Sequence, residues 1–462
     1  MGLNMLTDVR KSVTIGIYQL ERTIPMKSFS RKNWLLLLLF GTIGQIAWSV
    51  ENMYFNLFVY EEIAPNLDTV TLMVQLSGIA ATLVTLLAGT LSDKVGNRRS
   101  FISIGYIIWG VTVGLFGCTS PEIVGSIFGM PATEAVKLTL TLAVAGDCVM
   151  TLFGSSANDA AFNAWVTDNT ESSYRGRVES ILSILPLIAL LIVAGGFGIL
   201  KDLIGFRNLF IGLGAAITLC GVTGLFLFKD APTLEKNGGL GDILYGFKPS
   251  VIKQNAPFYV TLLSVAVFGI AFQVFMPYLI IFMSQYLGFS TLEYSAVFAV
   301  AILAGAGVNI YLGKLSDKME KSKLLYFASG ILFVGLLIMY LASMIENKIA
   351  LILLFGLGGF VMICGNIFSG ALNGSILRDH TPNGAAGKMQ GVRMVASVLI
   401  PMLVGPAIGN AINRARGILL ENPGADAMTT EYLPAPEIFL VGAIASLLVL
   451  AVVPFIRKAE KR

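Results

Sequence analysis

Charged side chains are scarce in this sequence. Asp, Glu, Lys and Arg make up 13% of its 462 residues, whereas a soluble domain usually carries about 25%. Apolar residues make up 55% and gather in long runs, and about 20 helical residues suffice to cross a bilayer core of about 30 Å. The composition therefore excludes a soluble multidomain protein and a disordered one, and it predicts an all-α membrane protein.

Several kinds of chemical site are also missing. The four cysteines form no close Cys-x-x-Cys pair, and the single histidine, His380, cannot supply a histidine-based metal cluster or a Ser-His-Asp set. The sequence contains no Gly-x4-Gly-Lys-Ser/Thr phosphate loop, which argues against ATP-driven transport by this chain alone. We therefore expect no enzyme activity, no cofactor and no metal site.

Twelve apolar stretches are long enough to be membrane-spanning helices. The first of them serves as the insertion signal, because the N-terminal 30 residues show no compact apolar core with a cleavage site. We place the spans at residues 33–60, 69–90, 99–119, 138–167, 177–198, 208–228, 258–286, 292–313, 324–344, 349–377, 389–410 and 437–456.

The distribution of positive charge predicts the orientation. With the N-terminus inside, 25 of the 32 Lys and Arg residues fall in cytoplasmic segments or at their span edges, six fall outside, and Arg393 lies within a span. This asymmetry follows the positive-inside rule. It predicts a multi-pass protein of the plasma (inner) membrane with both termini in the cytoplasm, and it explains the net charge of +4 without a nucleic-acid partner.

Two polar stretches recur at half-length spacing. Residues 89–99 (GTLSDKVGNRR), which we interpret as a turn, are echoed 224 residues later at 313–318 (GKLSDK). Residues 168–170 (DNT) are echoed 211 residues later at 379–381 (DHT). Two echoes in the same order indicate duplication into two pseudo-symmetric six-helix bundles. The predicted organisation is a cytoplasmic segment 1–32, an N-terminal bundle 33–228, a linker 229–257, a C-terminal bundle 258–456 and a tail 457–462.

The first polar stretch resembles the loop between helices two and three of the major facilitator superfamily. With the twelve spans in two halves, the resemblance covers essentially the whole chain, and it implies alternating access between two bundles around a midplane site. In this loop Gly89 would allow close helix packing, and Asp93 would bond helix N-termini or basic residues in an inward-closed gate. The gate residues that we expect are Gly89, Asp93, Arg98, Arg99, Asp168, Arg175, Arg177, Asp317 and Arg393.

Shorter stretches at 97–102, 158–162 and 175–177 resemble the glycoside–pentoside–hexuronide:cation symporters and their sucrose-transporter-like relatives. The melibiose-permease branch carries paired acids on helix two, at positions that fall near Ala81 and Thr85 here. Their absence favours protons over sodium as the coupling cation, although sodium stays open. The acid of helix four aligns with Asp159, whereas Asn163 replaces the aromatic residue one turn later.

Charged residues inside a span cost about 2.5–3.5 kcal/mol on insertion scales, so each one marks a possible site. In span four, polar residues recur every four positions, which places them on one slanting stripe that faces the bundle interior. We expect one of its acids to carry the coupling proton or to contact substrate; the alternative is an inter-helix hydrogen bond or a permanent pairing. The stripe consists of Asp147, Thr151, Ser155, Asp159 and Asn163.

Span one combines an aromatic ring with amides and an acid, the side chains that suit sugar hydroxyls. Trp48 could equally be a packing residue. The second half offers amides on spans seven and ten. The candidate substrate or coupling residues are Gln45, Trp48, Glu51, Asn52, Asp147, Asp159, Asn163, Gln273, Asn366 and Asn373.

The sequence thus favours a monomeric secondary active transporter in a lipid bilayer, working as a proton-coupled symporter of a sugar or glycoside. Three alternatives stay open. The same fold could export amphipathic compounds or lipids, could act as a passive facilitator, or could serve as a non-transporting membrane sensor.

Overall fold

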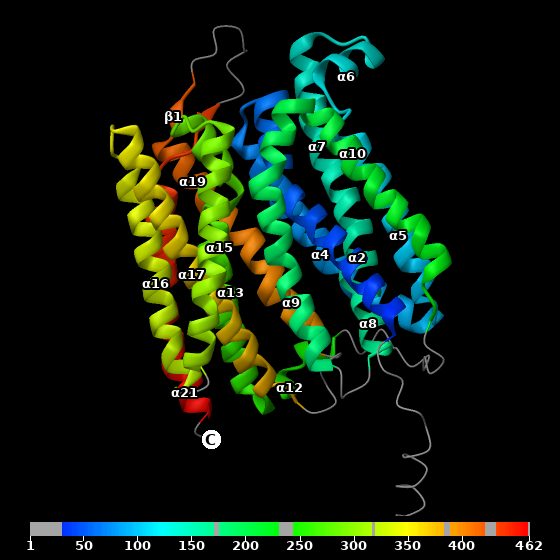
Figure 1. The fold of residues 1–462 in the computed structure, drawn as a ribbon, viewed down its shortest axis with the longest axis vertical. Coiled ribbons are helices and arrows are strands. Elements are labelled where there is room, and N and C mark those ends of the chain that lie inside the picture. Colours follow the sequence, from blue (N-terminus) through cyan, green and yellow to red (C-terminus); the bar gives the residue numbers. More distant parts are fainter. Residues whose placement is uncertain are drawn as a thin grey trace, which may run out of the picture.

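The chain is a bundle of long helices that run side by side from one end of the molecule to the other (Figure 1). The computed structural model describes residues 30–170, 175–230, 244–316, 319–382, 389–420 and 431–460. The short helix α6 (Pro121–Phe128) and the two-residue strands β1 (Ile418–Leu419) and β2 (Tyr432–Leu433) lie at one end. The C-terminus lies at the opposite end, near α12 (Pro249–Gln254). Because the distribution of positive charge predicts that the C-terminus is cytoplasmic, we call these the outer end and the cytoplasmic end.

The first bundle holds the spans that precede the predicted linker. Their elements are α2 (Arg31–Val50), η1 (Glu51–Phe55), α3 (Asn56–Phe58) and η2 (Val59–Ile63); α4 (Leu67–Val95); α5 (Arg98–Phe116); α7 (Ala132–Gly154), η3 (Ser155–Phe162) and α8 (Asn163–Asp168); and α9 (Arg175–Ile192), η4 (Val193–Phe197) and α10 (Gly198–Leu227).

The second bundle follows the short helices η5 (Tyr245–Phe247) and α12. Its elements are α13 (Ala256–Gln273), η6 (Met276–Tyr278), α14 (Leu279–Ile281) and η7 (Phe282–Tyr286); α15 (Thr291–Ser316); α16 (Lys321–Ala342); α17 (Lys348–Asp379); α18 (Gln390–Met394), η8 (Val395–Leu399) and α19 (Ile400–Arg416); and α20 (Glu437–Leu447) and α21 (Val449–Glu460).

The predicted twelve spans are confirmed within the described ranges. Eleven continuous helical stretches are long and apolar enough to cross a membrane. One of them, Ile181–Leu227, has 47 residues and would be about 70 Å long at 1.5 Å per residue, twice what a span needs. Gly205 interrupts it with φ 76° and ψ 160°, a backbone conformation that glycine alone adopts readily. The break divides this stretch into spans five and six.

The expected turn at 89–99 is much shorter than predicted. Helix α4 continues to Val95, so residues 89–95 form its last turns. Gly96 then takes a left-handed conformation and ends the helix. Asn97 Oδ1 accepts a hydrogen bond from Ser100 N at 3.0 Å and begins α5. The polar residues indicate where the helix leaves the membrane, and the backbone turns only at 96–97.

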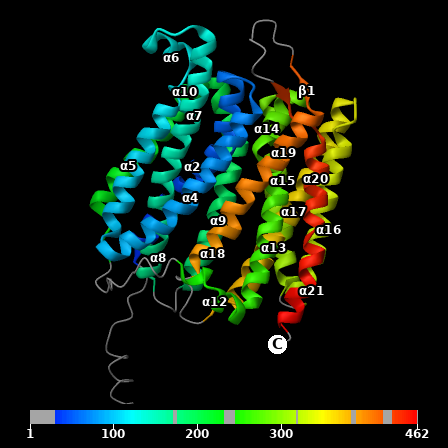
Figure 2. The ribbon, with the colours of Figure 1, turned by 180° about the vertical axis from the view of Figure 1, so that it is seen from behind.

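Several spans contain short π-helical stretches, in which the backbone winds more widely. Glu51 begins one of them, η1, and Asp159 lies in another, η3. Such stretches occur frequently at functional sites because they change the direction of nearby side chains. Between the bundles, α4 packs against α19, and α10 packs against α15; Figure 2 shows α4 and α19 from the opposite side.

Candidate functional site

Three acidic side chains gather inside the first bundle, and we call Glu51, Asp147 and Asp159 the carboxyl cluster. Glu51 and Asp147 are buried. The Thr151 hydroxyl donates a hydrogen bond of 2.8 Å to Glu51 Oε1, and Ser77 of α4 lies beside the Asp147 carboxyl group. Asp147 and Asp159 are both close enough to Glu51 to repel a charge on it. The sequence thus singled out acids that the fold brings together.

No cation balances the carboxyl cluster in the part of the chain that the structure describes, because none of its members forms an ion pair there. Glu51 Oε2 and Asp147 Oδ1 are buried without a hydrogen-bond donor. An unpaired buried charge costs several kcal/mol, and a bound proton removes that charge. Over the same residues, no three His, Cys, Asp or Glu side chains converge as a metal site. The arrangement suits the binding and release of protons.

The polar stripe on span four becomes more exposed toward the cytoplasmic end. Asp147, Thr151 and Ser155 are buried, Asp159 is half-buried, and Asn163 is exposed. The Asn163 side chain donates to the Asp159 carbonyl oxygen at 3.1 Å. The stripe therefore runs from the protein interior toward the cytoplasmic surface.

Among the other span-one candidates, Trp48 lies beside the carboxyl cluster. The half-buried Trp48 ring packs against Trp109 of α5 with centroids 5.0 Å apart. Its indole N–H faces Asp159 without meeting the geometry of a hydrogen bond. Asn52 donates to the Trp48 carbonyl oxygen at 2.8 Å, and Gln45 is half-buried. The structure thus shows Trp48 as a packing residue, and its role in binding the substrate stays a prediction.

The second-bundle candidates are more dispersed. Gln273 and Asn366 are half-buried, whereas Asn373 is buried with its Oδ1 atom lacking a donor. Gln273 lies where α13 and α19 approach closely, since a Cβ added at Gly405 would be 2.5 Å from Gln273 Cβ. No hydrogen bond between described residues joins these amides to the carboxyl cluster.

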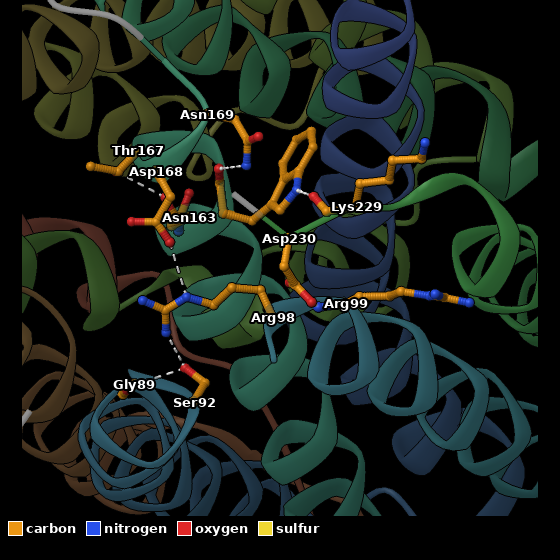
Figure 3. A network of polar contacts seen from close by, with 11 residues as sticks. Gly89, Ser92, Arg98, Arg99, Asn163, Thr167, Asp168, Asn169, Lys229 and Asp230 are labelled. Atoms are coloured by element: carbon orange, nitrogen blue, oxygen red, sulfur yellow. Dashed lines mark hydrogen bonds and ion pairs between the residues drawn. The ribbon is translucent and has the colours of Figure 1, made fainter. Parts of the chain in front are cut away.

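Arg98 connects three helices of the first bundle at the cytoplasmic end (Figure 3). Its Nε atom donates to Asp168 Oδ2 at 3.1 Å, and its Nη1 atom donates to Ser92 Oγ. Ser92 Oγ in turn donates to the Gly89 carbonyl oxygen at 2.9 Å. These contacts hold α4, α5 and α8 together, whereas the assignment of Arg98 and Asp168 to a gate stays a prediction.

Arg99 and the chain after α10 form a neighbouring contact (Figure 3). Asp230 Oδ1 accepts from the Arg99 backbone N–H at 2.9 Å, near the N-terminus of α5, where a negative charge is favourable. The Arg99 side chain donates to the Leu225 carbonyl oxygen. The Trp165 indole donates to the Lys229 carbonyl oxygen at 2.9 Å. The beginning of the predicted linker is therefore bonded to the first bundle.

The packing role expected of Gly89 is wrong for the described residues, because a Cβ at this position would meet nothing within 4 Å. Arg177 is exposed, and Arg393 is half-buried in α18. Three expected gate groups lie outside what the structure describes: the side chains of Asp93 and Arg175, and residue Asp317.

A set of contacts that the sequence did not predict joins the bundles at the outer end. Asp68 of α4 accepts from Arg414 of α19 at 2.9 and 2.7 Å, and from Asn410 at 2.7 Å. The Thr71 and Tyr278 hydroxyls lie 2.7 Å apart. Opposite charges at the outer ends of spans two and eleven were the available signal for the Asp68–Arg414 pair.

Two further outer contacts involve the end of span one. Tyr60 donates to the Tyr432 carbonyl oxygen of β2 at 2.9 Å. Glu61 accepts from Gln285 at 3.1 Å and pairs with Lys201 at 3.1 Å. Together with the Asp68 and Thr71 contacts, the bonds from Tyr60 to Tyr432 and from Gln285 to Glu61 hold the two bundles against each other at the outer end. The term outer contacts refers to this set, whereas the Glu61–Lys201 pair joins helices of the first bundle.

Comparisons with solved structures agree with this architecture. The chain is similar to a variant of the nucleoside transporter NupG (TM-score 0.67, 11% identity, covering 91% of this chain and 99% of that chain). It is also similar to a bacterial homologue of the human lysosomal transporter Spinster in an inward-facing, unoccupied conformation (TM-score 0.60, 14% identity, covering 94% of this chain and 96% of that chain). A third similar structure is a bacterial metal transporter (TM-score 0.55, 15% identity, covering 93% of this chain and 100% of that chain). At these identities the likeness concerns the fold.

Sequence comparison supplies the family. No curated protein matches the chain. Residues 36–406 match the sequence profile of the Major Facilitator Superfamily. This match spans most of the twelve helices, from the first span into the eleventh. The chain therefore belongs to the Major Facilitator Superfamily, whose members are secondary transporters.

Proposed function

We propose that this transporter moves a sugar or glycoside across the membrane together with protons. The observation that carries the proposal is the carboxyl cluster. Glu51 and Asp147 are buried, lie near each other and have no ion-pair partner in the described part of the chain. Two neighbouring carboxyl groups in a low-dielectric interior repel each other when both are charged. Binding one proton relieves that repulsion, so the state of the cluster responds to the proton gradient.

Side chains next to the cluster support a polyhydroxylated substrate. Trp48 offers an aromatic face, and Gln45 and Asn52 lie on the same helix with amide groups that can donate to and accept from hydroxyls. Asn366 would add an amide from the opposite bundle. The resemblance of short stretches to glycoside symporters points to the same substrate class.

The outer contacts support a cycle of alternating access. They join the bundles at the end that faces outward, so the described conformation is held together on that side. In the proposed cycle these contacts break, a proton and the solute enter from outside, and the bundles then close the outer end again. Proton release at the cytoplasmic end lowers the affinity for the solute. The ligands need only bind the two conformations differently.

The test is uptake into proteoliposomes that contain the full-length protein. A panel of labelled sugars is offered with a pH gradient or a sodium gradient imposed separately. We expect accumulation of at least one sugar driven by an inward proton gradient and unaffected by sodium. Uptake of no sugar would contradict the substrate class, and sodium-driven uptake would contradict proton coupling. Proton-driven extrusion of amphipathic compounds would favour the exporter instead.

Variants of the cluster test the coupling role. Glu51→Gln and Asp147→Asn remove a titratable group with little change in shape, and each should reduce gradient-driven accumulation at least about tenfold, equivalent to about 1.4 kcal/mol. The matched control is Glu62→Gln, an exposed acid at the outer end of the same span, which should leave accumulation unchanged. Full accumulation by both cluster variants would remove these residues from the mechanism.

A further inference from the structure

Asp159 belongs to a chain of hydrogen bonds that reaches two other spans. The Asn158 side-chain amide donates to Asp159 Oδ1 at 3.0 Å. The Tyr106 hydroxyl lies 2.9 Å from Asn158 Oδ1 and 2.9 Å from the Phe40 carbonyl oxygen. Its single proton serves these two acceptors in turn or is shared between them. One chain therefore connects span one through Phe40, span three through Tyr106 and span four through Asn158 and Asp159.

This chain of hydrogen bonds occupies the space that a side chain at position 44 would fill. A Cβ added at Gly44 of α2 would overlap Asn158 Oδ1 and would lie 2.8 Å from the Tyr106 hydroxyl oxygen. Tyr106 is fully buried and Asn158 is nearly so. The contact is thus built into the interface of three helices, and its members have little freedom to reorient.

The groups around Asp159 are polar or acidic. Trp48 faces it from span one. On its own span, Ser155 lies nearby and the Asn158 amide donates to it. Glu51 of span one is close enough to Asp159 for their charges to repel each other. Tyr106 faces Asp159 from span three, and Asp147 lies farther along span four. In the described residues no basic side chain pairs with it. Asn158 is therefore the amide that fixes the direction of this carboxyl group.

We propose that Tyr106 and Asn158 are positioning residues that hold the Asp159 carboxyl group against the Trp48 indole. The proposal rests on the proton-coupled function above, which gives Asp159 a proton to exchange. Because the Tyr106 hydroxyl also contacts span one, the two residues hold spans one, three and four in a fixed arrangement around Asp159. They position the acid and need not touch the solute.

The test requires no solute. The tryptophan emission of the purified full-length protein is followed as a function of pH. Because Trp48 faces Asp159 and packs against Trp109, a proton on Asp159 changes this emission. We expect a transition that Asp159→Asn removes and that Trp48→Phe also removes. Tyr106→Phe should move its midpoint by about half a pH unit, and Asn158→Ala by about one unit, the sizes expected for weakening and losing one hydrogen bond to a charged group.

The matched control deletes a different buried hydroxyl, which lies on span four. Thr139 is buried and donates to the Ala135 carbonyl oxygen of its own helix at 2.6 Å, so Thr139→Val should leave the midpoint unchanged. If Tyr106→Phe does not yield folded protein, Asn158→Ala removes the donor to Asp159 without adding a charge and should still move the midpoint.

Two results would overturn the proposal. One is a wild-type protein without a transition that depends on Asp159; the other is a folded Tyr106→Phe variant whose midpoint equals that of the wild type. If no sugar of the panel is taken up, the proposed substrate class is contradicted, but the expected pH dependence of the tryptophan emission is unaffected. The two proposals can therefore fail separately.

Discussion

Ion pairs join helices within a bundle at both ends of the molecule, whereas the pair between Asp68 and Arg414 at the outer end joins the two bundles. At the cytoplasmic end, Arg98 bonds to Asp168 within the first bundle, and Lys321 bonds to Asp379 within the second. At the outer end, Asp68 and Arg414 bond across the two bundles. The first two pairs stiffen a bundle, whereas the third holds one bundle against the other.

In the proposed cycle, this difference between ion pairs within a bundle and between bundles indicates which contacts must break. Rocking of two rigid bundles preserves bonds within each bundle and exchanges bonds between them. A pair within a bundle can be buried and strong without opposing the motion. A pair between bundles must be weak enough to open in every cycle, and the Asp68 and Arg414 side chains, 36% and 58% exposed, meet that requirement because exposed ion pairs contribute about 0–1 kcal/mol.

The largest expected effect concerns the pair within the first bundle. Asp168→Ala removes a carboxylate that bonds to the Arg98 side chain, which is 6% exposed, and we expect a loss of about 3 kcal/mol of stability. The control is Asp379→Ala, the equivalent position of the second half, where Lys321 and Asp379 are 33% and 60% exposed and the loss should stay below about 1 kcal/mol. Thermal unfolding in detergent measures both. Equal losses would contradict the distinction.

A smaller effect is expected for the pair between the bundles. Asp68→Asn should leave the unfolding temperature nearly unchanged and raise the ratio of outward-open to outward-closed protein about fivefold, equivalent to about 1 kcal/mol. Distances between spin labels at the outer ends of α4 and α19 report this ratio.

The control for Asp68→Asn is Glu293→Gln. Glu293 pairs with Lys348 at 3.0 Å, also at the outer end but within the second bundle. This variant should not change the distribution of distances. An equal opening of both variants would show that loss of any outer charge has the same effect, and the Asp68–Arg414 pair would lose its special role.

The smallest effect is expected for Arg177. The sequence assigns it to the gate, but its side chain is exposed and forms no ion pair with a described residue. Arg177→Ala should therefore change the free energy of unfolding by less than about 0.5 kcal/mol and leave the label distances unchanged. A clear opening or closing of the bundles would restore Arg177 to the gate.

Hydropathy and periodicity in the sequence predict much of the fold. The apolar runs predict the spans. The predicted gap between spans five and six, residues 199–207, contains Gly205, where a positive φ interrupts the helix. The stripe on span four followed from its four-residue spacing. These features depend on neighbours within one helix, which a sequence displays directly.

Other features depend on distant neighbours, and the sequence did not reveal them. The stretch 89–99 was taken as a turn because it is polar, yet polar residues continue α4 to Val95. Asp68 and Arg414 are separated by 346 positions, and neither lies in a motif. The Tyr106–Asn158 contact needs the space left by Gly44, which only the packing of three helices shows.

The contact between Tyr60 and β2 has a consequence for molecular recognition from outside. β2 belongs to the second bundle and Tyr60 to the first, so the surface around the 2.9 Å bond from Tyr60 to Tyr432 is composed of both. Such a composite epitope exists only while the outer end is closed. An antibody fragment raised against it would select that conformation and arrest the cycle there.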